Sequence, residues 1–291
     1  MSNIFLKLDK IIKMEEKMLT EIVKFLFYSS LIVLISKYIL ATSIRKIANN
    51  LNMKSKIVGD IFGAATSVPE LLTITTSSLR GLYGASLFNI LSSNVINLIQ
   101  YLFTIIFHKN IKKLKNKALK IDIILVITTI IIPIILLQTN FEFNISIVPL
   151  LIILFFLYVV LNNNTHKLYL KNEKEIIDNT INKTNKNRKN LLINIFLLIS
   201  SAISLYFIGE LLGNNLENLC RIFNVPEFLI GILLGIITSI PEFITFFEAQ
   251  KYHNKKENEM SGVIEATNNL FTSNILNLFI IQAIGILLIN R

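Results

Sequence analysis

Eight long apolar segments, separated by shorter polar stretches, set the pattern of this 291-residue sequence. Segments such as 122–138 (DIILVITTIIIPIILLQ) carry almost no charge. A helix of about 20 apolar residues crosses the hydrocarbon core of a bilayer. The pattern therefore predicts an all-α polytopic membrane protein with about eight transmembrane helices. They are expected near residues 25–43, 57–79, 83–107, 121–138, 145–162, 191–212, 228–249 and 262–289.

The composition supports this class, because 53% of the residues are hydrophobic and only 16% are charged, against about 25% charged in soluble domains. A single cysteine, Cys220, excludes a disulfide within the chain, and three histidines leave little material for a zinc or copper site. We therefore expect no cofactor. The first 24 residues have mixed charge and no small-residue cleavage site, so we expect an uncleaved lead-in that is amphipathic or disordered.

The basic residues indicate the orientation in the membrane. The loops after the first, third, fifth and seventh spans hold 20 Lys and Arg residues, whereas the loops on the other side hold only Arg80 and Arg221. The positive-inside rule predicts cytoplasmic basic loops and an external N-terminus, although the lysines of the N-terminal tail weakly oppose this. Because the basic residues lie in loops between the apolar spans, the net charge of +10 does not indicate nucleic-acid binding, and the expected partner is the lipid bilayer. The sequence leaves open whether the protein forms a homo-oligomer.

The Lys- and Asn-rich stretch 163–190 is predicted to be a cytoplasmic linker. It divides the chain into an N-terminal membrane half, 1–162, and a C-terminal membrane half, 191–291.

Each half carries one copy of an unusual polar segment. The block Thr-Ser-x-Pro-Glu occurs at 66–70 and again at 238–242. In the span that follows each block, four polar residues recur with an offset of 180: Asn89, Ser93, Asn94 and Asn97, then Asn269, Ser273, Asn274 and Asn277. In the predicted topology the two copies run in opposite directions. Inverted repeats of this kind, here about 57–107 and 228–289, build secondary transporters with a site at the repeat interface.

The repeated residues indicate cation chemistry. An ionised carboxylate inside a membrane costs about 2.5–3.5 kcal/mol, and the repeat spans place no Lys or Arg away from their ends to balance Glu70 and Glu242. A transported cation is the natural partner. The neighbouring donors are hydroxyl, amide and carbonyl oxygens, which suit Ca²⁺ or Na⁺ better than a transition metal. Protons are a further option. Pro69 and Pro241 are expected to interrupt their helices.

Other polar residues of these spans have less specific interpretations. Asn94 and Asn274 are expected to join helices and not to bind ions. Asp60 is expected at the cytoplasmic mouth of its span, where a helix N-terminus favours it. Glu210 is either a second functional carboxylate or, as we prefer, a residue near a water-exposed end of its span. Glu248 and Glu265 are also expected near water-exposed ends.

These motifs resemble those of the sodium/calcium exchanger family, whose inverted α-repeats carry G-T-S-x-P-E/D and G-N-x-x-G-S-N-x-x-N/D. Here the first repeat has A-T-S-V-P-E and F-N-I-L-S-S-N-V-I-N, and the second has I-T-S-I-P-E and N-N-L-F-T-S-N-I-L-N. The resemblance implies alternating access and exchange of Ca²⁺ for Na⁺ or H⁺ in a membrane transporter that is not an enzyme. It implies that Glu70 and Glu242 bind both ions and that Asn97 and Asn277 lie at the waist of the site. The hydroxyl ligands that it implies are Thr66, Ser67, Ser93, Thr238, Ser239 and Ser273. Of these, Thr66 and Thr238 would join the two glutamates in the metal site.

The chain departs from the family pattern in several places. The motif glycines are replaced by Ala65, Phe88, Ser92, Ile237, Asn268 and Thr272, so close backbone approach is expected to be less free. Asn277 stands where several members have Asp, which argues against potassium co-binding. Only 14 residues follow Asn277, so we expect the last two helices of the usual ten-helix plan to be missing. These departures motivate a competing hypothesis, a degenerate membrane scaffold that does not transport. An intramembrane hydrolase is disfavoured, because the spans show no nucleophile paired with a histidine.

Overall fold

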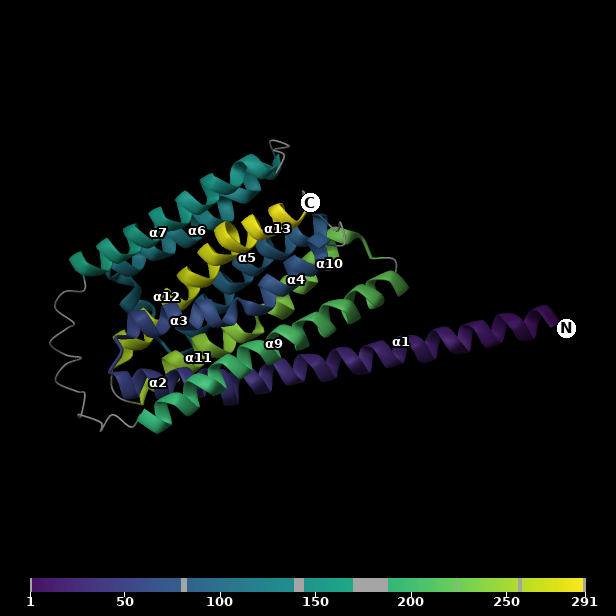
Figure 1. Ribbon diagram of the computed structural model, residues 1–291, viewed down its shortest axis with the longest axis horizontal. Coiled ribbons are helices and arrows are strands. Elements are labelled where there is room, and N and C mark those ends of the chain that lie inside the picture. The colour runs from purple at the N-terminus through teal and green to yellow at the C-terminus, as the bar shows by residue number, and fades with distance from the viewer. Residues whose placement is uncertain are drawn as a thin grey trace.

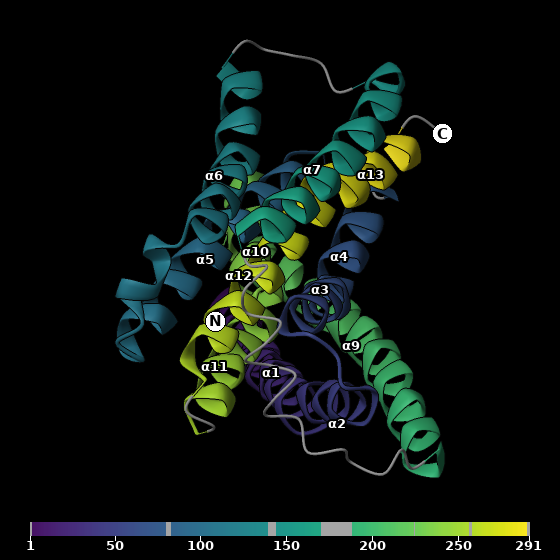
Figure 2. The ribbon, with the colours of Figure 1, turned by 90° about the vertical axis from the view of Figure 1, so that its left-hand side faces the viewer.

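The computed structural model describes residues 2–79, 83–138, 144–169, 188–223, 225–255 and 258–289, and every regular element in these ranges is helical. Eight helical segments of this part are long and apolar enough to cross a membrane, which confirms the predicted fold class. The helices form three layers, with the two repeats in the middle (Figures 1 and 2).

The first layer contains two long helical segments that pack against each other. One consists of α1 (Ser2–Leu34), the π-helical turn η1 (Ile35–Ala41) and α2 (Thr42–Leu51); the other is α9 (Arg188–Ile222). The lead-in expected to be amphipathic or disordered is therefore helical from Ser2. Its Leu, Met, Lys and Glu residues are good helix formers, and the helix continues without a break into the first span.

The middle layer contains the two repeats. The first consists of α3 (Ser55–Thr66), α4 (Val68–Leu79) and α5 (Tyr83–Phe107). The second consists of α10 (Glu227–Thr238), α11 (Ile240–Asn254) and α12 (Glu259–Ile275), extended by η4 (Leu276–Ile281) and α13 (Gln282–Ile289). The helices α3 and α10 begin and end at positions offset by 172. They pack across the repeats, α3 on α12 and α10 on α5.

The third layer is the helical pair α6 (Lys117–Gln138) and α7 (Val148–Tyr169), preceded by the short 3₁₀ turns η2 (Ile111–Lys115) and η3 (Ile145–Ile147). This pair packs on α12, η4 and α5. Because α7 extends to Tyr169 and α9 begins at Arg188, the predicted linker 163–190 is helical at both ends. Its middle, 170–187, lies outside the described residues.

Glycines bring the helices of the two repeats close together. A Cβ atom on Gly63 would lie 2.6 Å from the carbonyl oxygen of Asn269, and one on Gly235 would lie 2.8 Å from that of Asn89. The expectation that losing the motif glycines restricts close approach is therefore wrong. The approach uses glycines one helical turn before Ser67 and Ser239, and small residues at such interfaces let membrane helices pack tightly.

The ends of α2, α5, α7 and α11 lie together at one end of the molecule, while the start of α1 and the end of α13 lie at the other (Figure 1). The loops with many basic residues thus emerge from one end. We call it the basic end.

Candidate cation-binding site

Two helix breaks build the centre of the site. The helical segments of spans two and seven are interrupted at Ser67 (φ −78°, ψ 3°) and Ser239 (φ −80°, ψ 1°), as the prolines two residues later predict. The Ser67 hydroxyl donates to the carbonyl oxygen of Gly63 at 2.8 Å. After each break a new helix begins, with Glu70 or Glu242 in its first turn. A helix N-terminus favours negative charge, so each carboxylate gains some compensation there.

The two carboxylates share one buried place. Glu70 and Glu242 are both 0% exposed and near enough to repel each other. Each also lies near the threonine of the opposite repeat, Glu70 near Thr238 and Glu242 near Thr66. The inverted repeats therefore bring together residues about 170 positions apart in the chain.

Hydroxyl groups from both repeats contact one another beside the helix breaks, and one of them reaches Glu242. The Oγ atoms of Ser67 and Ser273 lie 3.0 Å apart, and Ser273 Oγ donates to Glu242 Oε1 at 3.1 Å. In the other half of the site, where α5 meets α10, Ser93 Oγ lies 3.4 Å from Thr238 Oγ1. All of these side chains are buried.

Four asparagines form a hydrogen-bonded quartet where α5 meets α12. The Nδ2 of Asn94 donates to the backbone oxygen of Asn274 at 3.2 Å, and Asn274 Nδ2 donates to that of Asn94 at 3.1 Å. The amide groups of Asn97 and Asn277 donate to Asn274 Oδ1 and Asn94 Oδ1 at 3.3 and 3.2 Å. Asn94 and Asn274 thus join the helices, as expected from the sequence.

What remains around the carboxylates is a set of oxygens without hydrogen-bond partners. A buried polar atom without a partner is costly and calls for an explanation, such as an ion. The buried side-chain atoms of this kind that the described residues place in the repeat motifs are all oxygens: Glu70 Oε1 and Oε2, Glu242 Oε2, Asn97 Oδ1, Ser239 Oγ, Asn269 Oδ1 and Asn277 Oδ1. Together with two formal negative charges, they suit a hard cation, since Ca²⁺ takes six to eight oxygen ligands.

The sequence reasoning missed two residues of this region, Thr73 and Thr245. Their hydroxyls donate to the backbone oxygens of Glu70 and Glu242, at 3.0 and 2.9 Å. They also accept the Asn89 and Asn269 amide groups at 2.6 and 2.7 Å. The signal was present, because both repeats read T-S-x-P-E-x-x-T. Asn89 and Asn269 therefore use their amide nitrogens to fix the turn that carries each glutamate.

Several expectations about the outlying acidic residues need correction. Glu265 is not near water but fully buried, since Arg45 Nη1 and Nη2 bind its carboxylate at 2.7 and 2.5 Å. Asp60 lies beyond the first turn of α3 and is held by Thr272 Oγ1 at 2.9 Å and Lys56 Nζ at 3.1 Å, so it is not explained by the helix N-terminus. Glu210 and Glu248 are partly exposed.

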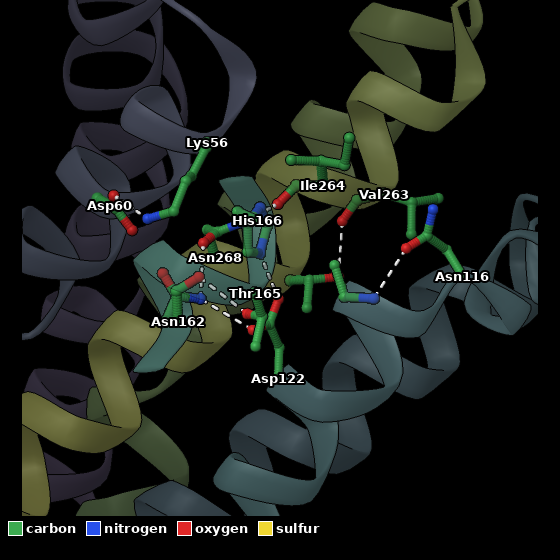
Figure 3. Close-up of polar contacts among 12 residues, drawn as sticks. Lys56, Asp60, Asn116, Asp122, Asn162, Thr165, His166, Val263, Ile264 and Asn268 are labelled. Carbon is green, nitrogen blue, oxygen red and sulfur yellow. Dashed lines mark hydrogen bonds and ion pairs between the residues drawn. The ribbon is translucent and has the colours of Figure 1, made fainter. Parts of the chain in front are cut away.

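A second buried polar cluster connects α6 and α7 to α12 (Figure 3). Asp122 is 0% exposed and accepts Asn162 Nδ2 at 2.9 Å, and it lies 2.6 Å from His166 Nε2. The same Asn162 nitrogen lies 3.3 Å from Asn268 Oδ1. Asn268 occupies the place of a motif glycine, so this departure serves to anchor the third layer. The described residues hold no cluster of three or more His, Cys, Asp or Glu side chains suited to a metal.

Two inverted repeats that enclose buried carboxylates and unpaired oxygens are typical of secondary transporters, whose sites lie at the repeat interface. Residues 22–162 and 193–290 match the model of the sodium/calcium exchanger protein family. The chain therefore belongs to the sodium/calcium exchanger family, a family of transporters.

Solved structures of the sodium-calcium exchanger NCX_Mj have the same fold. The form soaked with 2.5 mM Na⁺ and 10 mM Sr²⁺ is 21% identical, with a TM-score of 0.57 over 93% of this chain and 83% of that one. The form soaked with 10 mM Na⁺ and zero Ca²⁺ is 22% identical, with the same TM-score and coverage. The comparison with curated proteins finds no match.

Proposed function

We propose that this protein is a secondary active antiporter that exchanges Ca²⁺ for Na⁺ or H⁺ across a membrane by alternating access. The observation that carries the proposal is the pair of fully buried glutamates, three of whose four carboxylate oxygens have no hydrogen-bond partner. Such a pair is too costly to keep ionised without a counter-charge, and the unpartnered side-chain atoms of the described repeat motifs are all oxygens.

In this proposal Glu70, Glu242, Thr66 and Thr238 hold Ca²⁺ at the centre. Sodium ions use the same carboxylates together with the surrounding hydroxyl and amide oxygens, from Ser67, Ser93, Asn97, Ser239, Ser273 and Asn277. One Ca²⁺ neutralises the two carboxylates, and so do two Na⁺ or two protons. Competition for the same negative charges is what couples the opposing ion movements.

The proposed orientation places the basic end in the cytoplasm and the start of α1 outside. The two membrane halves, 1–162 and 191–291, each contribute one repeat to the site. In this proposal alternating access moves the layer of α1, η1, α2 and α9 as one bundle against the repeats, since inverted-repeat transporters work by moving one bundle against another around a fixed site.

Ion-dependent thermal unfolding in detergent tests whether the site binds cations at all. We expect Ca²⁺ to raise the unfolding temperature, with a stabilisation of about 2.7 kcal/mol at a hundred times the dissociation constant. Glu70→Gln and Glu242→Gln should abolish the response. Glu248→Gln is the matched control, because this α11 carboxylate is partly exposed and lies 3.9 Å from Lys251. A flat response of the unmodified protein to both Ca²⁺ and Na⁺ would favour the scaffold hypothesis instead.

A further inference from the structure

A buried charge cluster fastens the first layer to the repeats at the basic end. Arg45 of α2 binds both oxygens of the Glu265 carboxylate on α12, and His253 Nε2 of α11 lies 2.9 Å from Glu265 Oε2. The Arg45 and Glu265 side chains are only 14% and 1% exposed. Two parallel N–H···O bonds in a buried place make this one of the stronger polar contacts available to a protein.

Aromatic rings hold the guanidinium group in place. It lies 4.0 Å from the ring centroid of Tyr252 on α11 and 5.6 Å from that of Phe62 on α3. The Tyr252 hydroxyl donates to Asn49 Oδ1 on α2 at 2.7 Å, which adds another link between the layers. We use the name clasp for Arg45, Tyr252, His253 and Glu265. It ties α2 to two helices of the repeats, α11 and α12.

Because the structure is built on inverted repeats, the clasp at the basic end can be compared with the equivalent positions at the opposite end. The positions equivalent to Arg45 and Glu265 at the opposite end are Glu217 and Ala85, offset by 172 and 180. Glu217 pairs with Arg221 of its own helix at 2.5 Å, and Ala85 carries no charge. An Arg–Glu pair equivalent to the clasp is therefore chemically excluded at the other end, although the cation-site motifs are matched between the repeats.

We propose that the clasp biases the transporter toward the conformation that is closed at the basic end. Inverted symmetry by itself makes the two access states similar in energy, and a differential contact shifts a two-state equilibrium toward the state that contains it. Opening at the basic end must separate α2 from α11 and α12 and so break the clasp. Arg45, Glu265 and His253 are thus conformational residues, and they bind no transported ion. The inference rests on the proposed alternating access.

Side-specific cysteine labelling tests the clasp without relying on ion transport. Reporter cysteines are placed at Ile47 of α2 and Leu219 of α9, in a Cys220→Ser background; the two positions are offset by 172, each precedes one repeat, and their native side chains are 7% and 9% exposed. An impermeant thiol reagent is applied from either side of oriented vesicles in choline medium. The main variant is Arg45→Met with Glu265→Gln, because removing both charges leaves neither member of the Arg–Glu pair buried alone. Arg221→Gln is the matched control, since it breaks an Arg–Glu pair within one helix.

We expect the double variant to raise the labelling rate of the Ile47 reporter from the basic end at least about threefold and to lower that of the Leu219 reporter from the opposite side. Arg221→Gln should change neither rate. Unchanged rates, or equal increases at both reporters, would overturn the inference, because equal increases indicate general loosening. Strictly additive effects of Arg45→Met and Glu265→Gln would also overturn it, since residues of one clasp must couple. If Ca²⁺ does not raise the unfolding temperature of the unmodified protein, this result would instead count against the proposed function.

Discussion

Replacing Gly63 with alanine should separate the helices that form the cation site. The new Cβ would lie 2.6 Å from the Asn269 carbonyl oxygen, 2.8 Å from Thr272 Cβ and 2.9 Å from Ser273 N, all parts of α12. Ordinary contact begins near 3.4 Å, so α3 and α12 must separate by about 0.8 Å. No flexible side-chain end is available to move aside, because two of these three atoms are backbone and the third is a Cβ.

The magnitude follows from two opposing effects. Overpacking costs about 1–3 kcal/mol, whereas alanine in a helix interior gains about 0.5–1 kcal/mol over glycine. We therefore expect Gly63→Ala to lower stability by up to about 2.5 kcal/mol. Gly213→Ala is the control, because its Cβ would meet Leu234 Cδ2 and Thr73 Cγ2 at a comfortable 3.8 Å. This control should be neutral or slightly stabilising.

The helix separation should also weaken ion binding. The Ser67–Ser273 contact of 3.0 Å spans the α3–α12 interface, so moving the helices apart misplaces hydroxyl oxygens beside Glu242. Thermal unfolding in detergent, with and without Ca²⁺, measures both effects on one sample. If Gly63→Ala proves as stable as Gly213→Ala and responds normally to Ca²⁺, the reasoning about close approach is refuted.

Two further predictions concern the ligands themselves. Exchange should be independent of K⁺, because Asn97 and Asn277 leave only two formal negative charges at the centre, and an extra cation would give the desolvated site a net charge of +1. Asn277→Asp should raise the affinity for monovalent cations. Obligatory K⁺ dependence of the unmodified protein would contradict this placement of Asn277. Thr245→Val should weaken Ca²⁺ binding several-fold, since it leaves the buried Asn269 amide without its acceptor at a cost of about 1–3 kcal/mol, while Thr245→Ser keeps the hydroxyl. Titration calorimetry compares the two variants, and equal affinities would exclude a positioning role for Thr245.

Much of this architecture could be predicted because membrane spans and repeated motifs leave strong local signals. The spans follow from length and apolarity, and the repeats follow from blocks such as Thr66–Glu70 that are unusual in an apolar segment. The role of Asn94 and Asn274 in joining helices was predicted, but that they bind each other was not.

Other features depend on contacts between distant segments, which a single sequence does not display. Glu265 looked like a residue near a span end, but its environment is set by Arg45, 220 positions away. The role of Gly63 could not be predicted from the family motif, because the motif glycine corresponds to Ala65 whereas the close helix contact lies two residues earlier. Asp122 stands at the start of an apolar segment, and its partners come from α7.

Calcium uptake into reconstituted vesicles tests the central claim most directly. Vesicles loaded with Na⁺ and diluted into Na⁺-free medium, and separately vesicles under a pH gradient, are supplied with ⁴⁵Ca²⁺. The account predicts uptake driven by at least one of these gradients, abolished by Glu70→Gln and by Glu242→Gln and retained by Glu248→Gln. Uptake that is unchanged in both glutamate variants, or absent from the unmodified protein under every gradient, would contradict it.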